Sequence, residues 1–201
     1  MNRPPLGVIV TRGDVDLLEI LATMPILLGW HTRIWDNSEQ IDFGPFGQFL
    51  GAMPRPKSAG RHSMRTSELV YFQDDDCVTD PTAIAAEHEP GRIVCNMPQE
   101  FRANYEHQPD KLMGFGSCFE RSLIRPTFEH YLRCFPIDPV LLREPGRIFT
   151  GLNQDRIKLV DVPKRDLPWA TAPNRLYRQA DHQWYAEEAR RRVRFILEKR
   201  K

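Results

Sequence analysis

The sequence predicts an α/β fold in which one sheet is flanked by helices on both faces. Short apolar runs typical of strands alternate with helical segments, and each run ends in a polar turn. The 201 residues, 41% of them hydrophobic, suffice for one core. In such sheets ligands bind beyond the carboxyl ends of the strands. The polar residues that follow the strands are therefore the first place to search for a site.

Charge and composition exclude several classes of protein. The 28 basic and 27 acidic side chains nearly cancel, so no overall field draws the chain to nucleic acid or to an anionic membrane. No run approaches the roughly 20 apolar residues of a membrane span, and the first residues do not resemble a signal peptide, so we expect a cytoplasmic protein. The 4 cysteines lack the spacing of a zinc site or a disulfide scaffold, and we expect them to be reduced and mostly buried.

The amino-terminal half is predicted to hold three strands, each followed by polar residues. Between the first two, the apolar spacing from Val15 predicts a helix that stops near Thr23, because Pro25 cannot continue it. Residues 43–62 mix glycine, proline and aromatic residues and are predicted to form a loop, with one turn of helix at Phe46–Leu50. The predicted strands are Leu6–Val10, Thr32–Trp35 and Leu69–Phe72.

The carboxyl-terminal half is predicted to alternate strands and helices in the same way. Gly114 and Gly116 indicate a tight loop ahead of a helix from about Phe119 to Cys134. An amphipathic helix is predicted from Asp181, with acidic residues early and basic residues late, as the helix dipole favours. The predicted strands are Ile93–Asn96 and Ile157–Val160.

Three adjacent carboxylates, Asp74, Asp75 and Asp76, follow the third predicted strand. Carboxylates at this spacing repel one another, so hydrogen bonds, solvent or a cation must offset the repulsion. Hard oxygen ligands select Mg²⁺ or Mn²⁺, and these ions share their coordination shell with substrate phosphates. A solvated acidic turn is the simpler interpretation of three aspartates. The apolar strand directly before them favours a metal or nucleotide site.

The segment Tyr71–Asp76 resembles the signature of nucleotide-sugar glycosyltransferases with the GT-A fold, in which a strand ends in an Asp-x-Asp (DxD) motif. The first strand, the turn that closes the second strand and Gly114–Ser117 occur in the order seen in that family. The resemblance covers about residues 6–185, and the triple aspartate is its specific part. It implies a GT-A-like, Rossmann-type mixed sheet flanked by helices.

By this resemblance the chain is a metal-dependent transferase that moves a sugar from a nucleotide-sugar donor, UDP- or GDP-linked, to an acceptor hydroxyl. The cofactor is Mn²⁺ or Mg²⁺. A single domain spans residues 1–201, with a nucleotide-binding half at about 6–80 and an acceptor half at about 90–201 that ends in a closing helix. The acceptor stays open among a protein, a glycan, a lipid-linked hydroxyl and a DNA-linked hydroxyl.

The resemblance also implies roles for individual residues. Asp76 is the principal metal ligand and acts with Asp74, while His182, ahead of the last helix, completes the metal shell. A surface histidine is the other interpretation of His182. The loop with two glycines lies beneath the donor sugar or the acceptor, unless it is an ordinary turn. The residues that would contact the nucleotide-sugar are Thr11, Arg12, Asp36, Asn37, Asp74, Asp75, Gly114, Gly116 and Ser117.

A catalytic carboxylate is predicted at Glu144 or Asp155, which flank a segment that corresponds in order to the catalytic carboxylate of the family. An inverting enzyme needs such a group as general base on the acceptor hydroxyl. The runner-up class is a metal-dependent nucleotidyltransferase, although the sequence has no glycine-rich loop with a following lysine for a triphosphate. A non-catalytic nucleotide-binding module is the third interpretation.

Overall fold

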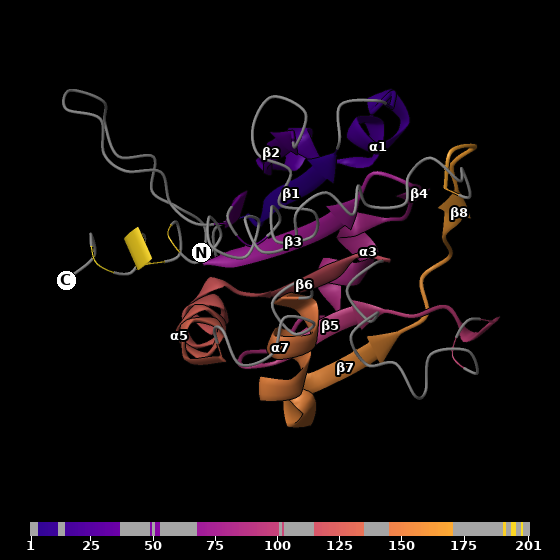
Figure 1. Cartoon of the computed structure of the whole chain (residues 1–201). Helices are drawn as coiled ribbons and strands as arrows, with labels where there is room; N and C mark the ends of the chain where they lie inside the picture. The colour runs from indigo at the N-terminus through magenta and orange to yellow at the C-terminus, as the bar shows by residue number, and fades with distance from the viewer. Residues whose placement is uncertain are drawn as a thin grey trace.

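The computed structural model of the chain describes two sheets and the helices that pack on them (Figure 1). None of the helices in the described ranges is long and apolar enough to cross a membrane. The described residues are 4–11, 15–36, 49, 51–52, 68–100, 102, 115–134, 145–170, 191, 194–195 and 198.

The main sheet is six-stranded and mixed, which confirms the α/β class. Its strands are β1 Leu6–Thr11, β2 His31–Asp36, β3 Leu69–Asp74, β5 Ile93–Asn96, β6 Ser117–Glu120 and β7 Ile157–Val160. They follow the order β2-β1-β3-β6-β5-β7, and β6 runs antiparallel to both of its neighbours while the other pairs are parallel. The strand order reverses at β1, which pairs with β2 on one side and with β3 on the other.

Helices α1 (Leu18–Thr23) and α3 (Pro81–Ala86) pack on one face of this sheet. Side chains from both helices and from five of the strands meet there in one core cluster. Because the cluster joins residues from both halves of the sequence, the two predicted halves share a core. Its buried members are Ile9, Ile20, Met24, Trp30, Tyr71, Ile84, Val94, Cys118, Val160 and Leu167.

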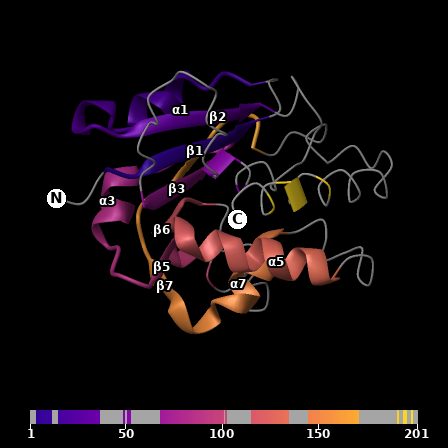
Figure 2. The same ribbon diagram turned by 90° about the vertical axis from the view of Figure 1, so that its left-hand side faces the viewer.

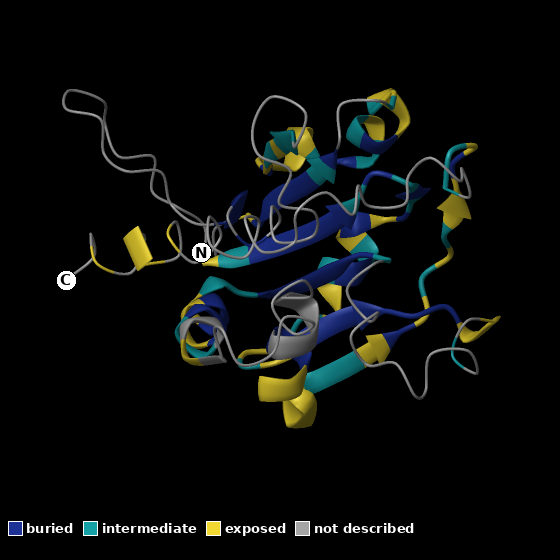
Figure 3. Cartoon of the chain, in the orientation of Figure 1, coloured by how far each residue is buried: buried dark blue, intermediate teal, exposed yellow. Residues whose placement is uncertain are grey.

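Helices α5 (Ile124–Cys134) and α7 (Pro145–Leu152) cover the opposite face, as Figure 2 shows. Buried phenylalanine rings fill this side. The ring of Phe119 lies 4.9 Å from that of Phe72 and 4.6 Å from that of Phe149, between centroids. Packing of this kind adds about 0.5–1.5 kcal/mol per pair beyond the area that it buries. Figure 3 shows the consequence, since the central strands are buried on both faces.

The first helix ends where the sequence predicts, but it begins at Leu18 instead of Val15. The backbone N–H of Leu18 donates to Oδ1 of Asp16 at 2.8 Å, which satisfies one of the free donors at the helix start. The helix ends at Thr23, and Met24 takes an extended conformation because the following Pro25 disfavours the helical one. The predicted stop is therefore confirmed.

The segment Ser117–Glu120 was expected to lead from a loop into a helix, and this prediction is wrong. It forms β6, which pairs with β3 on one side and with β5 on the other. The helix that follows begins only at Ile124, after a short 3-10 turn. Pairing on both sides and burial of Phe119 outweigh the helical spacing of the local sequence. By contrast, the strands at Ile93–Asn96 and Ile157–Val160 are confirmed with the predicted bounds.

Candidate functional site

The carboxyl ends of the first three strands bring three of the predicted nucleotide contacts together. Thr11, at the end of β1, pairs with Asp36 at the end of β2, and the neighbouring Val10 pairs with Asp74 at the end of β3. Thr11 is buried, whereas Asp36 and Asp74 are half-buried. They form one row across the edge of the sheet at the point where the strand order reverses, which is where α/β sheets bind ligands.

The start of β6 lies at the same edge. Because β6 is antiparallel, its first residue Ser117 is the partner of Phe72 in β3 and of Cys95 in β5, close to the ends of both strands. The carbonyl of Gly116 accepts a hydrogen bond of 2.9 Å from the backbone N–H of Asn96. The structure therefore places Gly116 and Ser117 beside the row of strand ends.

The reason for a glycine at position 116 differs from the predicted one. Its φ is +95°, and a Cβ built there would lie 2.6 Å from Oη of Tyr71 and 3.0 Å from Cδ1 of Ile84. A positive φ and a close approach both require glycine. Since the crowded side faces the core, packing on Tyr71 explains Gly116, rather than the close approach of a substrate that the sequence led us to expect. The turn interpretation is the one that this geometry favours.

The Asp run, Asp74–Asp76, links β3 to a second, smaller sheet. Asp74 ends β3, and Asp75 and Asp76 form the turn into β4 (Cys77–Val78). Strand β4 pairs antiparallel with β8 (Arg165–Asp166), which follows β7 much later in the chain. The turn is thus held by a distant segment, and Figure 1 shows β8 beside β4 at the end of the main sheet.

Two further hydrogen bonds tie the backbone of the Asp run to the segment after β8. The N–H of Leu167 donates to the carbonyl of Asp76 at 2.8 Å. The indole Nε1 of Trp169 donates to the carbonyl of Asp75 at 2.6 Å. These two bonds fix the backbone of the turn that carries the three carboxylates.

The side chain of Gln73 holds the backbone of the turn, a role that was not predicted from the sequence. Its side chain is buried, and Nε2 donates to the carbonyl of Cys77 at 2.8 Å and to that of Asp74 at 3.1 Å. Its Oε1 accepts from Oη of Tyr71 at 2.7 Å and from Oγ1 of Thr79 at 3.0 Å. A buried amide with all of these groups satisfied rigidifies its surroundings. The available signal was a polar residue within an otherwise apolar strand.

Burial and charge keep the neighbouring acids of the core protonated. Burial is the main cause that raises the pKa of the Cys77 thiol, the carboxylates of Asp74 and Asp76 raise it further, and Lys164 opposes them. Burial also raises the pKa of Tyr71. Both groups are therefore neutral at neutral pH.

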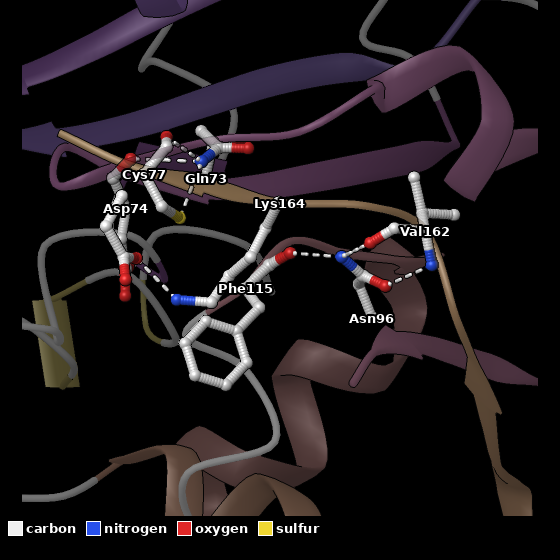
Figure 4. A network of polar contacts seen from close by, with 8 residues as sticks. Gln73, Asp74, Cys77, Asn96, Phe115, Val162 and Lys164 are labelled. Carbon is white, nitrogen blue, oxygen red and sulfur yellow. Dashed lines mark hydrogen bonds and ion pairs between the residues drawn. The ribbon is translucent and has the colours of Figure 1, made fainter. Parts of the chain in front are cut away.

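Lys164 is the second residue that the sequence analysis missed. Its side chain is only 5% exposed, and Nζ lies 2.5 Å from Oδ1 of Asp166 and 4.3 Å from the centroid of the Phe115 ring. Figure 4 shows this side chain pointing toward Asp74. In the sequence Lys164 is followed by two further charged residues, a pattern typical of a solvated surface.

Asn96, at the end of β5, holds the segments that surround Lys164. The side chain is fully buried, and Nδ2 donates to the carbonyls of Phe115 at 3.1 Å and of Val162 at 3.0 Å, while Oδ1 accepts from the N–H of Val162 at 2.9 Å (Figure 4). The Asn96 amide thus fixes the backbone of Phe115, whose ring lies against Lys164. It also fixes the backbone of Val162, which leads to Lys164.

Asp155 does not join the other predicted site residues. It precedes β7, and its carbonyl accepts a hydrogen bond of 2.9 Å from Nη1 of Arg92, which precedes β5. Because β5 and β7 are parallel, both residues lie at the amino ends of the strands, opposite the Asp run. We therefore correct the prediction and leave Asp155 out of the site. Arg12, Asn37, Gly114, Glu144 and His182 lie outside the described residues.

Asp74 and Asp76 carry carboxylate oxygens at this edge, and such oxygens are the ligands that a hard divalent cation prefers. In the part of the chain that the structure describes, no three His, Cys, Asp or Glu side chains form a metal-binding group. Mg²⁺ in nucleotide sites is held by one or two carboxylates plus phosphate oxygens and water, and Asp74 and Asp76 can supply that number. No protein-family model matches the chain, and no curated protein matches it significantly.

Proposed function

We propose that the chain is a metal-dependent glycosyltransferase that uses a nucleotide-sugar donor. The observation that carries the proposal is the position of the Asp run at the carboxyl end of β3, beside β1, where the strand order reverses. Thr11 and Asp36 from the neighbouring strand ends complete the row. A mixed sheet with acidic residues at this position supports the resemblance to the GT-A fold.

The rigidity of the turn favours a site over a solvated acidic turn. Its backbone carbonyls accept hydrogen bonds from Gln73, Leu167 and Trp169. The adjoining strand β4 is paired with β8. A turn that only faces solvent needs none of these contacts. Binding sites, in contrast, need their ligands held within about 0.5 Å of the working geometry.

In this proposal Asp76 and Asp74 hold Mn²⁺ or Mg²⁺ together with the donor diphosphate. The ion, when bound, offsets the charge that develops on the leaving nucleoside diphosphate. Thr11 and Asp36 lie on the nucleotide side of the row, and the backbone of Ser117, at the start of β6, borders the donor sugar. His182 as third protein ligand and Glu144 as general base remain predictions from the resemblance, as do the contacts of Arg12, Asn37 and Gly114.

Donor hydrolysis tests this function. We expect the chain with Mn²⁺ to release free sugar slowly from a UDP- or GDP-sugar, and to show a higher melting temperature when donor and Mn²⁺ are both present. Asp76→Asn should abolish both effects with the fold intact. Asp155→Asn, at the opposite edge, is the matched control and should behave like the wild type.

The competing functions give different results in the same assays. Release of pyrophosphate from a nucleoside triphosphate identifies a nucleotidyltransferase, the second candidate. Stabilisation by nucleotides without release of sugar or pyrophosphate identifies a binding module. Equal donor affinity in wild type and Asp76→Asn would overturn the assignment of the Asp run to the metal.

A further inference from the structure

We propose that Lys164 is an internal counter-ion of the Asp run, and that a divalent cation bound at Asp74 and Asp76 must compete with the Lys164 ammonium. The inference rests on the metal role proposed above for the Asp run. It adds to that role a residue of this chain that sets how tightly the ion binds in the absence of a nucleotide.

Burial is the first observation. The side chain of Lys164 is 5% exposed, whereas that of the next residue, Arg165, is 59% exposed. A buried ammonium is costly unless carboxylates surround it, and lysine is among the side chains least often found inside proteins. Asp166, at 2.5 Å from Nζ, supplies one carboxylate, and Figure 4 shows the side chain pointing toward Asp74.

Charges of both signs meet around one buried thiol. Burial is the main cause that raises the pKa of the Cys77 thiol, the carboxylates of Asp74 and Asp76 raise this pKa further, and the ammonium of Lys164 lowers it. The neighbourhood of Cys77 therefore contains the Asp run and the lysine together. Within a partly buried site the interaction between opposite charges is screened far less than on the surface. The ammonium thus offsets part of the repulsion among the carboxylates.

The backbone holds Lys164 in this place. Asn96 binds Val162 on one side of it, and β8 pairs with β4 on the other, so that Asp166 is opposite Cys77. The ammonium, at the end of a four-carbon stem, lies over the Phe115 ring. When a cation occupies the Asp run, Asp166 still gives the displaced ammonium a partner.

This arrangement makes metal binding depend on the nucleotide. A lone cation must displace the favourable interaction of Lys164 with the carboxylates. A cation that arrives with a diphosphate brings negative charge with it, and that charge gives the ammonium a new partner at the same edge. Metal and donor should therefore bind the wild-type chain together more readily than the metal alone.

Calorimetric titration of the full chain with MnCl₂, without nucleotide, tests the inference. Lys164→Met keeps the apolar stem on Phe115 and removes the charge, and we expect Mn²⁺ to bind it about 10-fold more tightly than the wild type. Lys164→Arg keeps the charge and should bind like the wild type. Arg165→Met is the matched control, because its exposed guanidinium pairs with Glu19, and its Mn²⁺ affinity should not change.

The rise in melting temperature on adding Mn²⁺ is a second readout, and it tests the inference even when a variant is less stable than the wild type. For Lys164→Met and for Lys164→Gln, the rise in melting temperature on adding Mn²⁺ should exceed that of the wild type. Equal or weaker Mn²⁺ binding in folded Lys164→Met, with no larger rise in either variant, overturns the inference while the metal role stands. Absence of Mn²⁺ binding in the wild type and in both variants overturns the metal role and this inference together.

Discussion

The indole Nε1 of Trp169 donates a hydrogen bond of 2.6 Å to the backbone carbonyl of Asp75, 94 positions earlier in the chain. The ring also packs against the core cluster, so the bond is anchored. This contact makes the geometry of the Asp run depend on a segment that lies beyond the last strand of the main sheet.

Trp169→Phe should therefore weaken the site more than the fold. The variant keeps an aromatic ring and loses one hydrogen bond, which is worth about 1 kcal/mol of unfolding free energy. We expect a loss of stability of that order in urea, together with a clear drop in the stabilisation that donor and Mn²⁺ provide. Wild-type stabilisation by donor and Mn²⁺ in Trp169→Phe would show that the indole only packs.

Gln73→Leu should be more damaging to stability. Leucine fills a similar volume, but it leaves the carbonyl of Cys77 and the hydroxyls of Tyr71 and Thr79 without the amide that binds them. A buried polar group that loses its partner costs about 1–3 kcal/mol. Urea unfolding should show a loss in or above this range. A loss of less than about 0.5 kcal/mol would mean that water replaces the amide.

Gly116→Ala should destabilise the chain because the new Cβ is held at φ +95° and faces Oη of Tyr71 at 2.6 Å. Strain of this kind costs about 1–3 kcal/mol. Tyr71→Phe removes the oxygen that the Cβ meets, so in a double-mutant cycle the two changes together should cost less than the sum of the single changes. Strict additivity would contradict the proposed contact.

The stability of the chain should fall with acidity as His88 becomes charged. Partial burial lowers the pKa of His88 below its ordinary value of 6.5, and nearby Glu120 and Glu89 only partly oppose it. The unfolded chain then binds the proton more readily, so this contribution to stability is complete above about pH 6.5 and is lost as pH falls through the folded-state pKa. Titration of the His88 ring by NMR should give a midpoint below 6.5. In His88→Gln this part of the pH dependence should be absent, and a midpoint at or above 6.5 would contradict the sign.

Buried thiols provide a simple check on the core. Cys77, Cys95 and Cys118 are free and buried, as expected from the cysteine spacing. Burial raises the pKa of Cys95 and of Cys118 to about 12, so little thiolate forms at pH 8. A thiol reagent should label these three only after the chain is unfolded, and rapid labelling of the native chain would contradict their placement in the core.

Local patterns in the sequence were sufficient for several elements. The strand at Leu69–Phe72 that leads into the Asp run was predicted from β-branched and aromatic residues, and the end of the first helix from Pro25. Both depend on the conformational preferences of neighbouring residues, which a single stretch of sequence contains. The position of the Asp run at a strand end was correct for the same reason.

Contacts between segments far apart in the chain determined the features that local sequence patterns did not predict. Strand order and direction decide that Thr11, Asp36 and Asp74 share one edge and that Asp155 lies at the other. The burial of Lys164 likewise follows from segments far apart in the chain, because Asn96 and β4 hold the backbone on either side of it. In a sequence, a charged residue next to other charged residues is typical of a solvated surface. Only the packing of the folded chain buries the side chain of Lys164 beside the Asp run.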